Sequence, residues 1–327
     1  MSRHKNNFDA LRLFFASCVI LSHSFALLGL HEPTIFGRSL GNVSVHGFFA
    51  ISGYLISASY IQQPDFKAFS IKRVLRIAPG LIAAIVVAHW AADLCEQFAH
   101  NPVPYIADGP VWTLTWEVVC YALVFIVGSC GALTAAAMPT LFVVAWLIYL
   151  INIDDPSSSY TVVAPLFLTF AAGVFAQVTR VNLRKCAIPA LCLLLFSAVP
   201  AISEPIVTFV RSNIPFLWGP PVSDGDIRAV SYLLSFPFVV LFVSLDVRPL
   251  LTIRDDLSYG VYLYGWIVAQ TLVYLASRHG KQFSPMPFFV ATMTVTLLVA
   301  WLSWRLIEQP ALQLKFIFLR RKATQVT

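Results

Sequence analysis

Three ionisable residues lie within the first apolar stretch of this sequence, at positions 8–30. They are Asp9, Arg12 and His23. A charged side chain at the centre of a bilayer costs at least about 2.5–3.5 kcal/mol, so such residues usually face a protein interior and serve a function. A histidine can accept and release a proton near neutral pH, which suits it to general-base catalysis. The stretch therefore predicts a membrane helix that carries a reactive site.

Further polar residues lie within later apolar stretches. At about 1.5 Å of rise per residue, His23, His46, His89 and Glu117 are expected at a similar depth in the outer half of the bilayer, on four different helices. A nearby carboxylate can orient a histidine and stabilise its cation. We therefore predict catalytic roles for His23 and Glu117. His46 is a predicted substrate contact, and for both His46 and His89 the alternative is a packed, hydrogen-bonded structural role.

Basic residues gather at the opposite end of the same helices. Arg73 and Arg76 are three positions apart, so they share one helix face, and Arg12 is expected at a similar level. Paired guanidinium groups suit a phosphate, because each can donate two hydrogen bonds to it. The alternative is general anchoring by positive residues at the cytoplasmic surface. Asp9 and Arg12, also three apart, can instead neutralise each other.

Aromatic residues near the ends of the apolar stretches are candidates for substrate binding. Tyr259 and Tyr262 are three apart near the start of one stretch, and Trp112 and Trp116 lie at the start of another. The alternative for the tyrosines is a place in the aromatic belt at the membrane interface.

In 48–54, Ser52 and Gly53 are small enough to let two helices approach closely.

The elements that position these residues are predicted to be membrane helices. Hydrophobic residues make up 58% of the 327 residues and charged residues only 12%, whereas soluble domains have about 25% charged residues. Stretches of roughly 18–23 residues can cross a hydrocarbon core of about 30 Å. We predict an all-α polytopic membrane protein with about ten transmembrane helices at 8–30, 43–62, 76–95, 112–130, 134–152, 161–179, 186–203, 227–245, 257–277 and 286–307.

Charge between these stretches predicts their orientation. Basic residues cluster at the amino terminus, at 67–76, at 180–185 and at 320–322, whereas the alternate loops are acidic or neutral. Both termini are therefore predicted to be cytoplasmic, with 278–285 as the one segment that disagrees. The net charge of +6 is explained by membrane anchoring, so nucleic acid is not an expected partner. The segment 204–226 is expected to be an external loop.

Neither a soluble domain nor a metal site is predicted. The six cysteines show no ligand spacing, and a P-loop and the GxGxxG motif are absent. We interpret residues 1–327 as a single transmembrane domain without an appended soluble domain.

Several of these stretches, taken in order, resemble the membrane acyltransferase-3 family, O-acyltransferases of surface polysaccharides and related acceptors. The matching stretches are FDALRLFFASCVILSH (8–23), VHGFFAISGYLI (45–56), IKRVLRIAPGL (71–81), VWTLTWEVVCY (111–121), LSYGVYLY (257–264) and RLIEQP (305–310). Many members have a histidine after the YLY stretch, where this chain has Gly265 and Trp266. A role of that histidine cannot be transferred to this chain.

The resemblance implies a ten-helix acyltransferase with acyl-CoA, most simply acetyl-CoA, as co-substrate. It implies that His23 is essential for acyl transfer and that Arg73 and Arg76 engage the donor from the cytoplasm. The first-helix Asp9 and Arg12 and the later Glu117 also match residues of the family, so we predict catalytic roles for Asp9 and Glu117 and donor binding by Arg12. The expected acceptor is a hydroxyl of a carbohydrate such as O-antigen, exopolysaccharide or a lipid-linked glycan. The expected location is a bacterial inner membrane.

A different class of protein offers an alternative interpretation. Histidine and glutamate within membrane helices also form proton relays in secondary transporters and flippases for lipid-linked sugars. Such transporters often contain inverted repeats around a site at the midplane of the bilayer. This sequence shows no such repeat, so the enzyme is the preferred interpretation.

Overall fold

The structure is a computed structural model that describes residues 6–320, except 153–159, 214–223, 250, 252 and 254. Several charged residues used to predict the orientation lie outside the described residues: Arg3, Lys5, Asp154, Asp155, Arg321 and Lys322. The chain divides into two compact units, which are described separately. The predicted all-α class is confirmed, because a two-stranded hairpin is the only sheet among the described residues.

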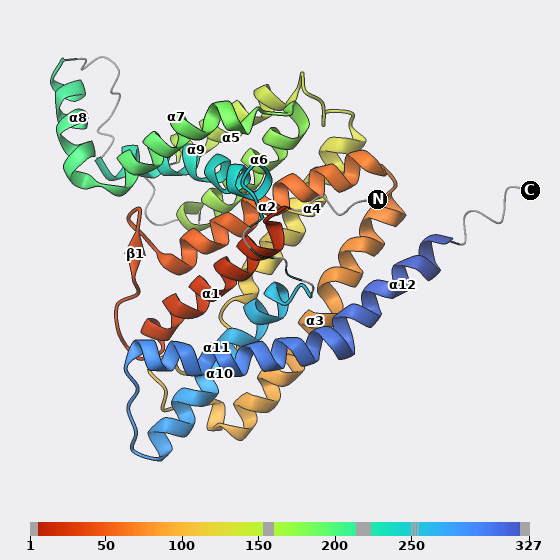
Figure 1. Ribbon diagram of the computed structural model, residues 1–327, viewed down its shortest axis with the longest axis vertical. Helices are drawn as coiled ribbons and strands as arrows, with labels where there is room; N and C mark the ends of the chain where they lie inside the picture. The colour runs from red at the N-terminus through yellow and green to blue at the C-terminus, as the bar shows by residue number, and fades with distance from the viewer. Residues whose placement is uncertain are drawn as a thin grey trace, which may run out of the picture. The chain divides into compact units, whose positions relative to one another are not determined.

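The first unit contains residues 34–59 and 116–250, with the first eight residues of the chain. In it α9 packs along α7 and α6, and α5 packs against α6 (Figure 1). Its elements are β1 (Thr34–Ile35), β2 (Arg38–Ser39), α2 (Leu40–Gln62), α4 (Val111–Ser129) from Trp116 onward, α5 (Met138–Ile151), α6 (Tyr160–Thr179), α7 (Leu183–Ala198), α8 (Pro200–Asn213) and α9 (Asp224–Leu245).

The second unit contains residues 9–33, 60–115 and 251–327. In it α10 packs against α11 and α3, and α12 packs against α3. Its elements are α1 (Phe8–Ala26) from Asp9 onward, α3 (Phe66–Leu94), η1 (Glu96–Phe98), the start of α4, α10 (Ser258–Arg278), α11 (Pro285–Ser303), the π-helical turn η3 (Trp304–Glu308) and α12 (Gln309–Arg320).

Each of the ten predicted transmembrane stretches coincides with a helix. Among the described residues, six helical segments are long and apolar enough to cross a membrane, and the bent pair α7 and α8 would make a seventh. The long helices α2 and α10 are less apolar because they carry polar residues such as Ser57 and Gln270, which are fully buried inside the protein. The chain is thus an integral multi-pass membrane protein. The count of ten crossings and the cytoplasmic position of both termini stay predictions.

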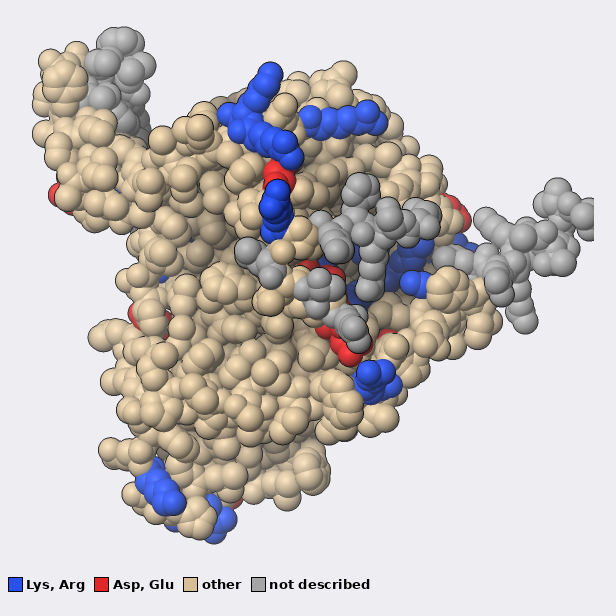
Figure 2. All heavy atoms as spheres, in the orientation of Figure 1, with Lys and Arg blue, Asp and Glu red and all other residues tan. Residues whose placement is uncertain are grey.

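The surface agrees with this assignment. Ile82, Val86 and Trp90 of α3 are all more than 60% exposed, as are other large apolar side chains on several helices. Figure 2 shows uncharged residues over most of one face, with the charged side chains gathered in a few places. In lipid, a helix satisfies its own backbone hydrogen bonds, so such apolar faces need no protein cover.

Several predicted boundaries are wrong, and α3, for example, begins at Phe66 and not at residue 76. The helix α1 ends at Ala26 and not at residue 30, because Gly29 adopts a φ of +73° and the Leu30 amide donates back to the Phe25 carbonyl at 2.9 Å. Glycine allows this left-handed cap at little cost. The predicted external loop 204–226 is helical as far as Asn213, as part of α8; residues 214–223 lie outside the described residues.

The predicted close approach at Ser52 and Gly53 is confirmed in the first unit. A Cβ atom on Gly53 would lie 2.1 Å from the Phe170 carbonyl oxygen of α6, and one on Gly173 would lie 2.2 Å from the Ala50 carbonyl oxygen of α2. The two glycines therefore bring the backbones of α2 and α6 into contact, as small residues do in membrane helix pairs.

Candidate active site

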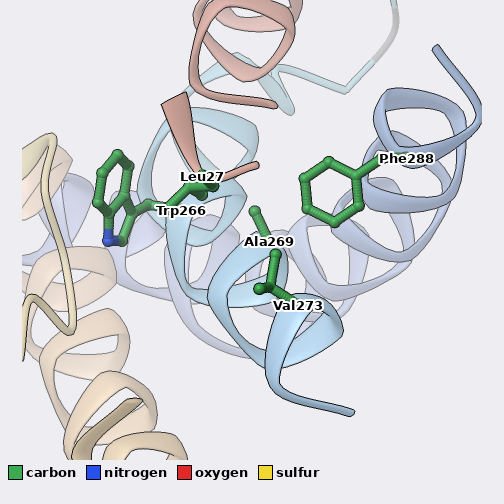
Figure 3. Close-up of a cluster of buried hydrophobic side chains, with 5 residues drawn as sticks. All are labelled: Leu27, Trp266, Ala269, Val273 and Phe288. Carbon is green, nitrogen blue, oxygen red and sulfur yellow. The ribbon is translucent and has the colours of Figure 1, made fainter. Parts of the chain in front are cut away.

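His23 lies on the face of α1 that contacts α10 in the second unit. A Cβ atom on Gly265 would fall 2.7 Å from Cγ1 of Ile20, so only glycine allows these two helices to approach so closely. The next residue, Trp266, then meets His23 edge to face, with 4.9 Å between ring centroids. Trp266 belongs to a buried apolar cluster with Leu27, Ala269, Val273 and Phe288 (Figure 3). The tryptophan is therefore rigid, and its ring restricts the orientation of the imidazole.

A carboxylate that the sequence analysis missed lies beside His23. The chain reverses at Gly29 after α1, and Glu32 returns to the helix, where its carboxylate accepts a hydrogen bond from the Ser22 hydroxyl. Its negative charge acts on the His23 ring. The available signal in the sequence was Gly29, which can end a helix, followed by the acidic Glu32. This signal does not predict which turn of α1 the Glu32 side chain contacts.

The segment 99–110 packs on α10 beside the same tryptophan. Trp266 Nε1 donates to the Ile106 carbonyl at 2.9 Å, and Gln270 Nε2 donates to the Val103 carbonyl at 2.7 Å. Asn101 Nδ2 donates to Gln270 Oε1 at 2.7 Å. These hydrogen bonds hold the segment in place, so its position relative to Trp266 is fixed.

Asp108 stands out in this segment. Both of its carboxylate oxygens are buried and have no hydrogen-bond partner among the described residues. The adjacent Gly109 packs on the Trp266 ring, with its notional Cβ 3.0 Å from Cδ2. Burial raises the pKa of Asp108 to about 7, because the charged form loses its hydration. A second missed carboxyl group thus lies near the tryptophan that contacts His23.

The predicted arginines form an ion cluster around an acidic residue that the sequence analysis did not select. Arg76 Nη2 lies 2.5 Å and Arg12 Nη1 lies 3.6 Å from the same carboxylate oxygen, Asp256 Oδ2. Ser258 Oγ donates to the other oxygen at 2.6 Å. The same Arg12 atom, Nη1, also lies 3.7 Å from Asp9 Oδ1, and Asp9 is half exposed. Asp9 and Arg12 therefore do form an ion pair, but Arg12 also shares Asp256 with Arg76.

Asp256 stays ionised despite its burial. Burial by itself raises the pKa of this carboxyl, but the charges of Arg76 and Arg12 and the hydrogen bonds from Ser258 and Arg76 lower it below the usual value. The carboxylate holds the two arginines at one level, as the sequence analysis expected for Arg12 and Arg76. It also orients the Arg76 guanidinium, which lies over the Tyr259 ring at 5.7 Å.

Arg73 and Arg76 line a groove between α3 and α12. Its volume is about 480 Å³. The shared helix face predicted for the two arginines is confirmed by this placement. The remaining lining residues are Lys72, Leu75, Leu312, Lys315 and Phe316.

Glu117 and His46 belong to the first unit, and each has a partner there. Glu117 accepts a hydrogen bond from Ser52 Oγ at 2.8 Å and another from the Tyr121 hydroxyl. His46 is only 2% exposed, and its Nδ1 lies 2.9 Å from the Tyr232 hydroxyl. The orientation of His23 by Glu117 stays a prediction. For His46, the buried hydrogen bond favours the structural alternative over substrate contact.

The four aromatic candidates lie in different environments. The Tyr259 hydroxyl donates to the Ile77 carbonyl at 2.7 Å, and the Tyr262 hydroxyl donates to the Pro110 carbonyl at 3.2 Å. Trp112 is 43% exposed. Trp116 lines an apolar pocket of about 440 Å³ on α4, α5 and α6 of the first unit. Substrate binding by these residues stays a prediction.

His89 lies apart from the residues described above. His89 is exposed on α3, with Nδ1 3.0 Å from the carbonyl oxygen of Ile85 one turn earlier, which fits the structural alternative. No three His, Cys, Asp or Glu side chains in the described part of the chain are grouped so as to hold a metal ion.

Comparison with known proteins assigns the family. A family described as an acyltransferase domain, acyltransferase-3, matches residues 5–305. An O-acetyl transferase of Shigella phage Sf6 is 27% identical over 343 residues, covering 94% of this chain and 96% of the relative. Nodulation protein 10 of Rhizobium leguminosarum bv. viciae is 28% identical over 380 residues, covering 98% and 97%. No solved structure matches the chain.

The chain therefore belongs to the acyltransferase-3 family, and the predicted resemblance is confirmed. It is a membrane-embedded acyltransferase. The family assignment favours the enzyme over the transporter or flippase that the buried histidine and glutamate also allowed.

Proposed function

We propose that this acyltransferase moves an acyl group, in the first place acetyl, from cytoplasmic acyl-CoA to a hydroxyl of a carbohydrate. The acceptor class is O-antigen, exopolysaccharide or a lipid-linked glycan, and the location is a bacterial inner membrane. The phage relative, an O-acetyl transferase, supports the reaction. The histidine with an adjacent carboxylate supports the chemistry.

The observation that carries the proposal is the arrangement of charges along α1. Arg12 shares Asp256 with Arg76 near one end of the helix, and His23 follows 11 residues later on the same helix. At 1.5 Å per residue the two levels are about 16 Å apart. An acyl-CoA bound through its phosphates at the arginines would therefore need a long extended arm to bring its thioester to His23. The pantetheine arm of coenzyme A is such a group.

His23 is the proposed general base. A ring nitrogen takes the proton of the acceptor hydroxyl while the oxygen attacks the thioester carbonyl. The new C–O bond forms, the C–S bond breaks, and the CoA thiolate leaves and takes up the proton that His23 received. The Glu32 carboxylate stabilises the His23 imidazolium that exists between these two proton transfers. The alternative route, in which His23 itself accepts the acyl group and then transfers it, uses the same residues.

The remaining candidates have proposed supporting roles. Arg73, Arg76 and Arg12 bind or balance the donor phosphates, and Asp9 fixes Arg12. Glu117 is proposed as a second carboxylate that orients His23. Tyr259, Tyr262, Trp112 and Trp116 are proposed to contact substrate, and acyl-CoA is the expected co-substrate.

The test measures transfer of radiolabelled acetyl groups from acetyl-CoA to glycan or glycolipid in membranes that contain the chain and its acceptor pool. Wild type is compared with His23→Ala and Arg76→Ala at matched protein levels. His89→Ala is the matched control, because His89 is an exposed histidine on a helix of the same unit. We expect label in wild type and in the control, and loss of label in both site variants.

Three outcomes of this experiment would contradict parts of the proposal. Transfer that survives in His23→Ala would contradict the catalytic role of this histidine. Transfer that survives in Arg76→Ala with an unchanged KM for acetyl-CoA would contradict the donor site. Absence of label with any acyl-CoA in the wild type would contradict the proposed donor.

A further inference from the structure

The groove between α3 and α12 has two kinds of wall. Lys72, Arg73 and Arg76 come from one helix, and Lys315 comes from the other, with its side chain partly buried. The apolar lining consists of Leu75, Leu312 and Phe316. Its volume of about 480 Å³ is in the range of pockets that hold nucleotide-sized ligands.

The described lining of the groove carries several positive charges. Arg76 is paired with Asp256 at 2.5 Å, and Lys72 donates to the neutral Gln63 side chain at 2.7 Å. Among the described residues that line the groove, none is acidic. Such a groove attracts a ligand with more than one phosphate, and its apolar side suits a flat ring.

A π-helical turn joins α11 to α12, which packs against α3. The turn, Trp304–Glu308, joins α11 to α12 and contains the buried Glu308, whose Oε1 accepts a hydrogen bond from Ser303 at 3.0 Å. Such turns are rare within helices and are frequent at functional sites. Because α12 packs on α3 after this turn, Lys315 and Phe316 are placed beside the arginines. In the sequence, α12 follows the last predicted transmembrane stretch, 286–307, and would be interpreted as a tail. The sequence therefore gives no reason to select Lys315.

We propose that Lys315 binds the 3′-phosphate of coenzyme A, and that Leu312 and Phe316 hold its adenine ring. Arg73 and Arg76 then take the diphosphate on the other wall. The inference rests on the proposed function, because it takes acyl-CoA as the donor. It adds a specificity: the groove selects CoA thioesters over acyl groups carried on phosphopantetheine, which lacks the adenosine and the 3′-phosphate.

The experiment measures binding by titration calorimetry on the full chain in phosphatidylcholine nanodiscs. The ligands are CoA, dephospho-CoA, which lacks only the 3′-phosphate, and phosphopantetheine. The variants are Lys315→Gln, which removes the charge, and Lys315→Arg, which keeps it. Lys67→Gln is the matched control, because it removes an exposed charge of α3 that does not line the groove.

We expect wild type to bind CoA about tenfold more tightly than dephospho-CoA, the size of one charged hydrogen bond, and to bind phosphopantetheine more weakly still. Lys315→Gln should bind CoA no better than dephospho-CoA, whereas Lys315→Arg and Lys67→Gln should retain the preference. Elution as a single species in size exclusion shows that each variant is folded. Equal affinity of wild type for CoA and dephospho-CoA, or an unchanged preference in Lys315→Gln, would overturn the proposal.

Two further arms separate the inference from its alternatives. An anionic lipid headgroup offers the same phosphate chemistry, so the titration is repeated in discs of equal parts phosphatidylcholine and phosphatidylglycerol. If anionic lipid abolishes CoA binding in wild type and not in Lys315→Gln, the groove is a lipid site and the proposal fails. Binding with the expected preference but without acetyl transfer would contradict the proposed function alone. No CoA binding at all would overturn both.

Discussion

His23 of α1 and His46 of α2 are both histidines inside apolar helices, but their surroundings differ in kind. His46 is buried and hydrogen-bonded to Tyr232, whose ring contacts both Phe36 and Phe236 with centroid distances of 5.1 Å to each. His23 is partly buried and lies between a rigid tryptophan and the charge of Glu32. His46 is hydrogen-bonded to a neutral hydroxyl and is close to the positive charge of Arg38, whereas His23 has a carboxylate that can stabilise its cation. This difference, and not burial alone, is the reason that we propose a reactive role for His23 and a structural role for His46.

The largest expected effect comes from His23→Gln. Loss of the general base should lower kcat for acetyl transfer by about a thousandfold, with little change in KM for acetyl-CoA. Steady-state kinetics on purified protein in nanodiscs measure both constants. A loss of less than about tenfold would place His23 with His46 and remove the contrast between them.

The next effect tests the partner of His23. Glu32→Gln keeps the shape of the side chain but removes its charge, so kcat should fall by about 10- to 100-fold, the cost of one charged interaction. Glu32→Asp should recover part of the rate. His31→Gln is the control, because His31 is the exposed neighbour of Glu32. Equal rates in wild type and Glu32→Gln would show that another group, with Glu117 as the first candidate, balances the charge.

The substitution His46→Phe tests the structural role of the other histidine in this comparison. This change leaves the buried Tyr232 hydroxyl without its partner, so we expect a loss of about 1–3 kcal/mol in the free energy of unfolding. Both kcat and the KM for acceptor should stay within about twofold, below the cost of one lost hydrogen bond. A raised KM for acceptor at unchanged stability would instead support the predicted substrate contact.

The smallest effect concerns pH and the surroundings of Trp266. Burial raises the pKa of Asp108 to about 7, so the folded protein binds its proton more tightly than the unfolded chain does. Stability contributed by the neutral carboxyl is present below about pH 4 and is lost as the pH rises towards 7. Thermal unfolding at pH 5 and pH 8 should show a larger fall for wild type than for Asp108→Asn. His46→Phe should keep the wild-type fall, because it leaves Asp108 unchanged.

Much of the fold followed from local features of the sequence. Hydropathy located a helix at each of the ten predicted stretches, because lipid requires apolar side chains and helical backbone whatever the partners are. It overestimated α1, where Gly29 ends the helix early, and it missed most of α8, the first ten residues of α3 and the helix α12. Hydropathy also did not distinguish α2 and α10 from the helices that are exposed to lipid. Their polar residues are tolerated because they are buried against other helices, which composition does not show.

The sequence by itself determined the membrane class, the acyltransferase family, and the selection of His23 and the arginine pair. A charge within an apolar stretch, or two arginines three apart, is a local pattern that helix geometry converts directly into a position.

Only the tertiary structure decided which groups these residues meet. It placed Glu32 beside His23, Asp256 between Arg12 and Arg76, and Lys315 at the groove. These partners are separated in the chain by as few as 9 or as many as 244 positions. No periodicity connects such positions. Their contacts depend on where a glycine ends a helix and on which helix faces then pack together.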